Sequence, residues 1–573
     1  MCLGLVWLSA AHTQQYTINT VTGNGIAGFL GDSGAAGAAE LSSPSGIAFD
    51  SKGNLYIADS QNHRVRMISG GIITTIAGNG TAGYLGDGLA ATAAELSNPS
   101  ALAFDSAGNL YISDTGNNVI RKIAGTTIGT FAGTQALGTG YGGDGGLANV
   151  AQLSSPTALA FDSAGNLYIS DTGNNLIRKV DLTSLIITSY AGAVGVTAGE
   201  LDHSIGLCFD ASGALYIADS NQSRIVKWIP PSTFTTVAGT GVAGFSGDGG
   251  PAVFAQLNHA AGVALDAAGS LYIADSNNSR IRKVTPDGNI STIAGRGGAA
   301  FSGDGGSATK AFLSNPRSLV VKPDGTVYIA DTGNGAIRLL TPNFPAINSG
   351  GVANAASYAT KLAPGMLATV FGTGFGTATV QTSATANWPT SLGGVGVLVN
   401  GVAAPVYYVT PGQIDFQVPW GTPVTGTVSV AVTLNGGSSN LVNVAVGTAA
   451  PGLFVLASGQ AAVENPDYSI NDPSNPAKVG TTIFAYLTGS GPVSPAATNG
   501  VPAPLSSLVY ATASYSATIG GLPATVSFAG LAPGFIGLVQ MNIVVPATLA
   551  PGSYLLSVTI DGQTSNAAPI TVK

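Results

Sequence analysis

Charge is scarce in this chain. Only 8% of its 573 residues are Asp, Glu, Lys or Arg, against roughly 25% in average globular proteins. The formal net charge is −8, and no run or stripe of basic residues occurs. Because proteins that bind nucleic acid neutralise its phosphates with Lys and Arg, we predict no nucleic-acid partner.

Long apolar runs and cysteines are also scarce. Beyond the N-terminus no run reaches the ~18 apolar residues of a transmembrane helix, so no transmembrane segment is predicted. Residues 1–15 resemble the apolar remnant of a secretory signal peptide without its positive start, and an apolar tail is the alternative. Of the two cysteines, Cys2 would leave with the signal. Cys208 would then have no disulfide partner, and its apolar neighbours predict a buried strand.

What the chain does contain is a short phrase that occurs six times in the first 340 residues. Each copy reads Leu-Tyr-Ile-Ala-Asp or a close variant, and the closing aspartates are 55, 57, 48, 56 and 56 residues apart. A period of that size is typical of an array of small β units. Long helical patterns are absent and β-branched residues are abundant, so we predict an all-β protein. The closing residues are Asp59, Asp114, Asp171, Asp219, Asp275 and Asp331.

Each repeat predicts four short strands. In the first repeat they fall within Pro44–Gly78, separated by tight, Gly- and Asn-rich turns. Four antiparallel strands repeated around an axis make a β-propeller. The sixth repeat lacks its fourth strand after Leu340, whereas a matching strand stands alone at Thr17–Gly23. We therefore expect the N-terminal strand to complete the last blade and close a six-bladed propeller over residues 16–343.

The repeat resembles the NHL family of six-bladed propellers. The resemblance rests on three phrases, as they stand in Pro44–Asp50, Gly53–Asp59 and Asn62–Arg66. It implies a scaffold that binds proteins, nucleic acid or sugars and that in some branches performs lyase or lactonase chemistry. Fold alone does not select among these functions.

The long loops between blades are the first candidate binding surface. They are expected on the same side of the ring as the turn after each second strand, and binding residues usually lie on such loops. Five loops carry a Gly-Asp phrase before an Ala-rich stretch. Either the Asp caps a short helix, which we favour, or the carboxylates hold Ca²⁺ or a polyol. These aspartates are Asp32, Asp87, Asp144, Asp248 and Asp304.

The fourth loop is about eight residues shorter and lacks the Gly-Asp phrase, which predicts a notch beside blade four. Next to it, His203 and His259 occupy equivalent positions of adjacent blades. Two neighbouring imidazoles could bind a metal or act in acid–base chemistry. We favour polar loop residues, since other blades carry Ser or Asn there and no third His matches. The candidate binding residues on this face are Asp87, Asp144, Asp202, His203, Asp248, His259, Asp304 and Arg317.

Two enzymatic alternatives find little support in the residues. Propellers of the amidating-lyase class carry histidine ligands immediately before the glycine of the Pro-x-Gly phrase, and lactonase-type propellers need Glu, Asn and Asp around a central metal. No cofactor is therefore predicted, and Ca²⁺ bound by the loop carboxylates is the alternative. The slot before the glycine holds Ser45, Ser100, Thr157, Ile205, Ala261 and Arg317.

Other repeated residues are expected to be structural. The closing aspartates should accept backbone N–H bonds in their turns, and the tyrosine of each phrase should pack between blades. Arginines on the third strands should lay their stems along the sheet and keep their charged ends in water. They are Arg66, Arg121, Arg178, Arg282 and Arg338.

The second half contains an internal duplication. Gln413–Pro419 is similar to Gln540–Pro546, and each copy ends in a Val-Thr-x-x-Gly hairpin. The strand spacing predicts two Ig-like sandwiches, over 346–448 and 449–573. The pair resembles the C-terminal domain of secreted Acidobacteria proteins, and each half resembles IPT/TIG modules. The resemblance rests on Asn354–Tyr358, Pro364–Gly365, Val370–Gly372, Gln413–Trp420, Asn475–Lys478 and Phe528–Gly534.

Together these features predict a secreted or cell-envelope binding protein. The propeller loop face would bind a protein or a glycan, and the Ig-like pair would anchor or space it. The alternative is a propeller lyase or lactonase-like hydrolase with a metal near His203 and His259. Sugar binding through Trp388, Trp420 or Tyr407–Tyr408 is open, although we expect these aromatic residues in the sandwich cores. The oligomeric state is not predicted.

Overall fold

The computed structural model describes residues 16–193, 201–230, 233–376, 379–434 and 437–573. Within these ranges the regular elements are β-strands and short 3₁₀ helices, without an α-helix, so the predicted all-β class is confirmed. One compact unit spans residues 15–342, and the other contains residues 343–573. The predicted signal peptide lies outside the described residues. None of the helices found in these ranges is long and apolar enough to span a membrane.

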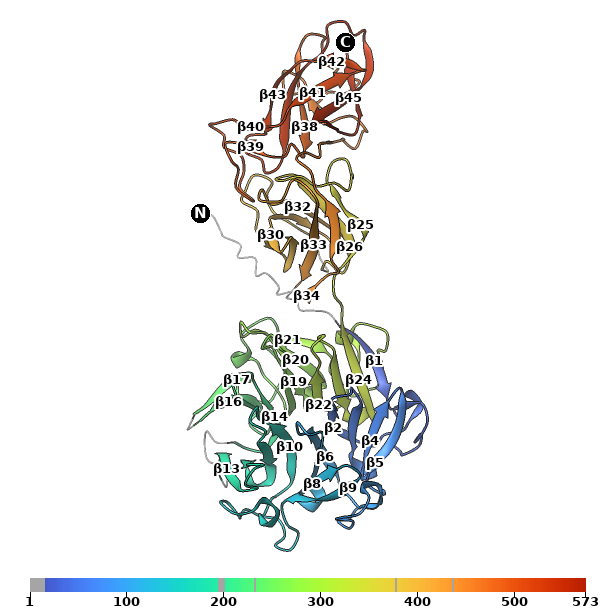
Figure 1. The fold of residues 1–573 in the computed structure, drawn as a ribbon, viewed down its shortest axis with the longest axis vertical. Helices are drawn as coiled ribbons and strands as arrows, with labels where there is room; N and C mark the ends of the chain where they lie inside the picture. Colours follow the sequence, from blue (N-terminus) through green and yellow to red (C-terminus); the bar gives the residue numbers. More distant parts are fainter. Residues whose placement is uncertain (1–15, 194–200, 231–232, 377–378, 435–436) are drawn as a thin grey trace. The chain divides into compact units, whose positions relative to one another are not determined.

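The first unit is a ring of six four-stranded antiparallel sheets (Figure 1). Blade 1 contains β2 (Pro44–Phe49), β3 (Leu55–Asp59), β4 (Arg64–Ser69) and β5 (Ile72–Ala77); blade 2 contains β6 (Pro99–Phe104), β7 (Leu110–Asp114), β8 (Val119–Ala124) and β9 (Thr127–Ala132); blade 3 contains β10 (Pro156–Phe161), β11 (Leu167–Asp171), β12 (Leu176–Val180) and β13 (Ile187–Gly192). Blade 4 contains β14 (Ser204–Phe209), β15 (Leu215–Asp219), β16 (Arg224–Ile229) and β17 (Thr233–Ala238); blade 5 contains β18 (Ala260–Leu265), β19 (Leu271–Asp275), β20 (Arg280–Val284) and β21 (Ile290–Ala294); blade 6 contains β22 (Pro316–Val321), β23 (Val327–Asp331), β24 (Ala336–Pro342) and β1 (Tyr16–Thr22).

The ring closes through the N-terminal strand, as predicted. Strand β1 pairs antiparallel with β24, and Ile18 lies opposite Leu340. The first strand of every blade contacts the first strands of both neighbouring blades around the ring. These inner strands therefore line a central channel, and the outer strand of blade 6 is no longer an unpaired edge.

The hydrophobic core of the propeller lies between blades. Ile57 and its equivalents are completely buried in clusters that combine residues of adjacent sheets. In four of the six phrases the tyrosine packs edge-on against a phenylalanine of the next blade, as between Tyr56 and Phe104, whose ring centroids are 4.8 Å apart. Each such buried side chain contributes roughly 1.5–3 kcal/mol. The expected packing of the tyrosines between blades is confirmed.

We expected the long connections between blades to lie on one side of the ring. Their central parts do not project from that face. In five of them a residue before the Ala-rich stretch bridges to the outer strand of the following blade, and the stretch forms a 3₁₀ helix whose first alanine is buried. These segments therefore cover outer strands and fill the seams between blades. The bridges are Ala35–Ile72, Ala90–Thr127, Leu147–Ile186, Pro251–Asn289 and Ser307–Thr17. The helices are η1 (Ala36–Ala38), η3 (Ala91–Ala93), η5 (Ala148–Val150), η7 (Ala252–Phe254) and η9 (Ala308–Lys310).

A second set of 3₁₀ helices forms the turn between second and third strands. Five of them are described, and each ends on a residue in the left-handed conformation, such as His63 at φ 52°. This geometry suits the Asn, Ser and Gly that stand at the equivalent positions. The helices are η2 (Ser60–Asn62), η4 (Thr115–Asn117), η6 (Thr172–Asn174), η8 (Ser276–Asn278) and η10 (Thr332–Asn334).

The second unit contains two consecutive two-sheet sandwiches, each with its own apolar core. The duplicated segments form β32 and β44, which occupy corresponding positions in the first sheet of each sandwich. The Ig-like assignment remains a prediction. The first sandwich contains β25 (Ala346–Asn354), β26 (Leu367–Thr373), β32 (Gln413–Gln417), β31 (Val406–Val409) and β27 (Val380–Gln381), facing β28 (Ser391–Leu392), β29 (Val395–Val399), β30 (Val402–Ala404), β33 (Thr427–Leu434), β34 (Gly437–Ser438) and β35 (Val442–Ala445). The second contains β36 (Gly452–Leu453), β37 (Val463–Glu464), β38 (Thr482–Thr488), β44 (Val539–Val544), β43 (Val526–Leu531), β40 (Val509–Ala511) and β39 (Val493–Ser494), facing β42 (Leu522–Ala524), β41 (Tyr515–Ile519), β45 (Gly552–Ile560), β46 (Gln563–Thr564) and β47 (Ala568–Val572).

Candidate functional site

Five arginines of the third strands are fully buried, contrary to the expected water-exposed ends. In blade 2, Arg121 pairs through Nη2 with Asp87 at 2.6 Å and through Nη1 with Asp114 at 3.4 Å. It also donates to the carbonyl oxygen of Glu95. The guanidinium has five donors, and the protein supplies these acceptors in place of water. The same arrangement occurs around Arg66, Arg178, Arg282 and Arg338.

An aromatic ring lies over each of these arginines. In blade 2 the guanidinium carbon of Arg121 is 5.2 Å from the ring centre of Tyr84, within the range of a cation–π contact. The ring comes from the same connection as the paired aspartate, three residues earlier. The sequence analysis missed this contact, although the aromatic at that spacing was visible in all five connections. The rings are Phe29, Tyr84, Tyr141, Phe245 and Phe301.

The aspartates of the connections therefore have a role other than the two that we considered. They do not cap the 3₁₀ helices, because the N-cap residues of these helices make no side-chain cap bonds. Their oxygens bind buried guanidinium groups instead and tie each connection to the following blade. No group of three or more His, Cys, Asp or Glu that could hold a metal occurs within the described residues. The candidates with this placement are Asp87, Asp144, Asp248 and Asp304.

Blade four lacks both the loop aspartate and the buried arginine. Its preceding connection lacks the Gly-Asp phrase, and Val226 stands where the other blades carry the buried arginine. The closing Asp219 keeps a cationic partner through Arg224, whose Nε lies 2.8 Å from the carboxylate. The arginine and the loop aspartate are thus present together in five blades and absent together in one. The predicted notch lies partly outside the described residues, at 194–200.

The residue that directly follows each closing aspartate carries a hydroxyl, and this hydroxyl links neighbouring blades at one end of the channel. Ser60, for example, donates to the carbonyl oxygen of Pro99 at 2.6 Å. In blade four, Ser220 hydrogen-bonds to Nδ1 of His259 at 2.9 Å. His259 therefore takes part in the contact between blades 4 and 5. The equivalent bonds are Thr115 to Pro156, Thr172 to Ser204, Ser276 to Pro316 and Thr332 to Pro44.

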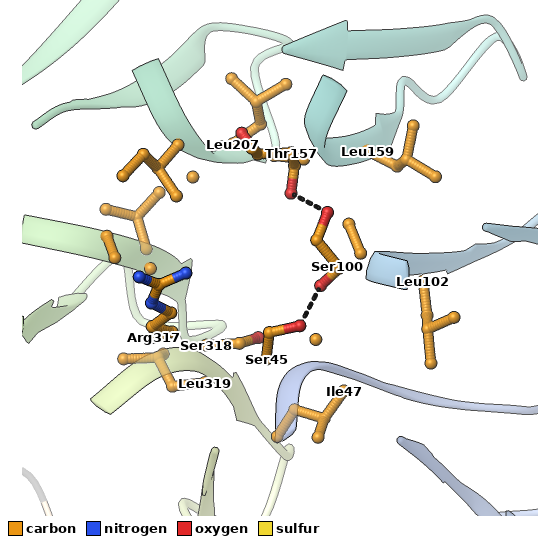
Figure 2. Close-up of a pocket in the computed structure, with 18 of the residues that line it drawn as sticks. Ser45, Ile47, Ser100, Leu102, Thr157, Leu159, Leu207, Arg317, Ser318 and Leu319 are labelled. Carbon is orange, nitrogen blue, oxygen red and sulfur yellow. Dashed lines mark hydrogen bonds between the residues drawn. The ribbon is translucent and has the colours of Figure 1, made fainter. Parts of the chain in front are cut away.

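The central channel has an uneven lining. Hydroxyl groups of Ser45, Ser100 and Thr157 face it from blades 1 to 3, Ile205 and Ala261 from blades 4 and 5, and Arg317 from blade 6. Figure 2 shows the Arg317 guanidinium directed into the ring, across from the three hydroxyls. All three hydroxyls donate to the next inner strand, as Ser45 does to the Ser100 carbonyl oxygen at 3.0 Å.

Two hollows meet at Arg317. One is the channel cavity of about 390 Å³, which His203 also lines. The other is a pocket of about 260 Å³ that includes His259, Asn277 and Asn315. Among the described residues, neither hollow is lined by an Asp or Glu, and the Arg317 side chain has no carboxylate partner. A cation without its counterion in a low-charge cavity attracts an anionic group.

Two other basic groups, His259 and Arg317, lie near enough to His203 to affect its pKa. Partial burial lowers the pKa of its imidazole below 6.5, His259 and Arg317 lower this pKa further, and Asp202 opposes them. Its backbone N–H donates to Asn175 Oδ1 at 2.8 Å. Asp202 accepts a bond from the Asn221 amide. The structure thus gathers Asp202, His203, His259 and Arg317 near one end of the channel and places the other four candidates in the arginine clusters.

Comparisons with known proteins find matches within the propeller. The family model for the Teneurin NHL domain matches residues 206–300 and 279–341, and the NHL repeat model matches residues 41–66. Teneurin-3 of Danio rerio is 30% identical over 399 residues, which make up 61% of this chain but only 14% of that protein. The chloroplastic protein SUPPRESSOR OF QUENCHING 1 of Arabidopsis thaliana is 30% identical over 333 residues, 53% of this chain and 30% of that protein.

Solved structures with a similar fold have low sequence identity. A structural-genomics protein of unknown function from Bacteroides thetaiotaomicron covers 58% of this chain and 77% of its own at 20% identity, with a TM-score of 0.44. A streptogramin B lyase covers 57% and 98% at 12% identity, with a TM-score of 0.38. The six four-stranded sheets and the repeat matches together support an NHL-type β-propeller over residues 15–342.

Proposed function

We propose that this chain is a secreted or cell-envelope binding protein whose propeller recognises an acidic group of a protein or glycan at the mouth of its channel. The observation that carries the proposal is the convergence of His203, His259 and Arg317 on hollows without a carboxylate. Arg317 supplies the permanent charge, because its guanidinium stays protonated at physiological pH. The second unit serves as an anchor or spacer.

Charge distribution in the rest of the propeller supports this site. The carboxylates of the connections are bound to buried arginines and are therefore not free to form a cation site. At the channel mouth, by contrast, the described lining includes basic groups and no such carboxylate partner. An acidic ligand entering it gains a charge-assisted hydrogen bond, and such bonds are roughly twice as strong as neutral ones.

The binding proposal is tested with the full chain on an array that presents neutral and acidic glycans beside acidic peptides. We expect binding to acidic probes that Arg317→Gln weakens at least tenfold, because a charged hydrogen bond contributes about 1.5–3 kcal/mol. Lys52→Gln is the matched control, since Lys52 lies in the turn between β2 and β3, on the opposite side of the ring. Equal loss in both variants, or no binding to any acidic probe, would refute the proposal.

The proposed location has its own test. The apolar stretch 1–11 and the low charge of the chain support export. Expression of the full chain and of a chain starting at residue 15, followed by fractionation of cells and medium, should place only the full chain outside the cytoplasm. Equal distribution of both chains would argue against export through this segment.

A further inference from the structure

A pocket of about 320 Å³ lies between the two sandwiches of the second unit. Aromatic rings from both sandwiches line it, with Tyr358, Trp388 and Tyr407 from the first and Phe454 and Phe535 from the second. Its volume falls within the range of small-molecule sites, which combine apolar walls with a few convergent polar groups. Nothing in the propeller site depends on it.

The walls of this pocket are held in place by hydrogen bonds between the sandwiches. The bonds involve backbone groups, side-chain amides and one threonine hydroxyl. The pocket therefore exists before a ligand arrives, and a preformed site avoids the cost of ordering its walls. The bonds are Leu367 N–H to Thr488 Oγ1 at 2.7 Å, Trp388 N–H to the Gly500 carbonyl at 2.9 Å, Gly500 N–H to Gln417 Oε1 at 2.7 Å and Asn354 Nδ2 to the Ala450 carbonyl at 2.8 Å.

The aromatic wall corrects one sequence prediction. Trp388 and Tyr407 do not belong to the core of the first sandwich but stack on each other at its border, with ring centroids 4.8 Å apart and planes at 26°. The Trp388 Nε1 group donates to the Ser383 carbonyl oxygen at 3.0 Å, which fixes the ring. Tyr358 is 64% exposed at the pocket and leaves its ring available for a ligand.

The polar wall comes from strands β26 and β32. Thr369 and Asp415 are direct partners across these strands, and they face away from the core that their neighbours Val370 and Ile414 enter. Asp415 accepts a bond from the Gln413 amide at 2.9 Å. The Thr369 hydroxyl is buried and has no hydrogen-bond partner in the described part of the chain. An unpaired buried polar group costs free energy. A ligand that forms a hydrogen bond with this hydroxyl would remove that cost.

We propose that this junction pocket binds a neutral sugar residue. The apolar face of a sugar ring packs on aromatic side chains, and its hydroxyls need both donors and acceptors, which Thr369 and Gln413 supply together with the Asp415 acceptor. An anionic ligand is disfavoured because Asp415 lines the pocket and, in the described part of the chain, no Lys, Arg or His does. A cationic ligand would use acceptors alone and would leave the donors of Thr369 and Gln413 unused.

The test titrates the full chain with a panel of neutral mono- and disaccharides and follows tryptophan fluorescence and heat. We expect at least one sugar to bind. Asp415→Asn should weaken binding at least tenfold, and Thr369→Val about five- to tenfold, as the loss of one hydrogen bond predicts. Thr369→Val should keep or raise the melting temperature, because it removes an unpaired buried hydroxyl. A merely structural residue would not separate binding from stability in this way.

Matched tyrosines provide the control. Tyr358 and Tyr468 are both exposed and both have positive φ, but only Tyr358 lines the pocket. Tyr358→Ala should weaken sugar binding severalfold, whereas Tyr468→Ala and Arg317→Gln should leave it unchanged. No binding by any sugar below a Kd of roughly 10 mM would overturn the proposal. So would binding of tetramethylammonium, rather than sugars, that Asp415→Asn abolishes.

Discussion

Each buried arginine of the propeller holds a connection, a second strand and a third strand together. Because its charge is fully removed from water, the guanidinium is stable only while its partners remain. Arg121 illustrates the point, with two carboxylates, one carbonyl oxygen and one aromatic ring around it. Five such clusters fix which connection packs on which blade.

This cluster predicts a stability effect that depends on its partners. Arg121→Val should lower the free energy of unfolding by about 3–5 kcal/mol, because it leaves the buried Asp114 unpaired. Asp87→Asn should cost only about 1 kcal/mol, since Asp87 is partly exposed and Arg121 keeps its other acceptors. Denaturant unfolding of both variants measures the two losses.

The double variant is the check on this interpretation. Arg121→Val combined with Asp87→Asn reproduces the combination that blade four already has with Val226 and no loop aspartate. Its loss should be smaller than the sum of the single losses, because the two residues act as a pair. Strict additivity would show that the pair contributes nothing beyond its separate members.

His203 predicts a pH dependence. Its folded pKa lies below the ordinary 6.5, so the unfolded chain binds this proton more readily. Stability is then complete above about pH 6.5 and falls as the pH drops through the window below it. His203→Asn should flatten this fall, and Asn suits the left-handed backbone there, as Asn98 shows at the equivalent position. Thermal melts between pH 5 and 8 measure the difference.

A direct measurement of the His203 titration completes this test. NMR should give a pKa below 6.5 in the native chain, and Arg317→Gln should raise it, because a neighbouring positive charge is removed. An unchanged pKa in this variant would mean that the Arg317 guanidinium lies too far from the imidazole for the proposed basic site.

At the scale of elements, each of five connections between blades crosses the outer strand of the following blade. We call these connections straps. Their close packing depends on glycine at one position. A Cβ on Gly86 would lie 2.6 Å from Ala94 Cα, at a φ of +109°. Gly88, two residues later at φ +82°, would place its Cβ in open space. An added Cβ would meet backbone strain at both glycines but steric overlap only at Gly86.

Alanine substitutions at these glycines should differ accordingly. Gly88→Ala should cost about 1 kcal/mol from the positive φ alone. Gly86→Ala should cost about 2–4 kcal/mol, because overpacking against the Ala94 backbone adds about 1–3 kcal/mol. Denaturant unfolding distinguishes them, and equal losses would show that the strap moves away from the seam without penalty.

Sequence alone predicted the strands and the ring better than the contacts of the straps. The alternation around Leu55–Asp59 and the spare strand at Thr17–Gly23 are local patterns, and both determined the outcome. The choice of Arg121 as the partner of Asp87 links residues 34 positions apart, which no local periodicity reveals. Its one trace was the joint absence of both residues in blade four.

The candidate sites were harder to predict for the same reason. The neighbouring positions of His203 and His259 followed from the repeat register, but the hydrogen bond from Ser220 depends on how blades 4 and 5 meet. The junction pocket depends on contacts between two sandwiches, and Trp388 alone gave no sign of its place. Contacts between repeating units are set by three-dimensional packing, which sequence patterns describe only indirectly.

At the scale of the whole molecule, ring closure predicts a strong effect of the first strand. Tyr16 and Ile18 of β1 are fully buried, and each contributes roughly 1.5–3 kcal/mol by burial. A chain that starts at residue 23 should therefore lose at least about 3 kcal/mol and expose β24 as an aggregation-prone edge. Thermal unfolding and light scattering measure both effects.

A chain that starts at residue 15 keeps β1 and is the matched control. It should melt like the full chain, which separates the loss of β1 from a general effect of shortening the N-terminus. If the chain starting at residue 23 melted at the same temperature and stayed monodisperse, the seam between β1 and β24 would not stabilise the ring.

The seam between β1 and β24 also has a consequence for synthesis. Tyr16 leaves the ribosome first, but its partner Pro342 follows roughly 320 residues later. At about 5–20 residues per second, this interval lasts on the order of 15–65 s. Throughout that time β1 has no native neighbour, and its three threonines and one asparagine stay hydrated. The ring therefore cannot close until nearly all of the toroid has been translated.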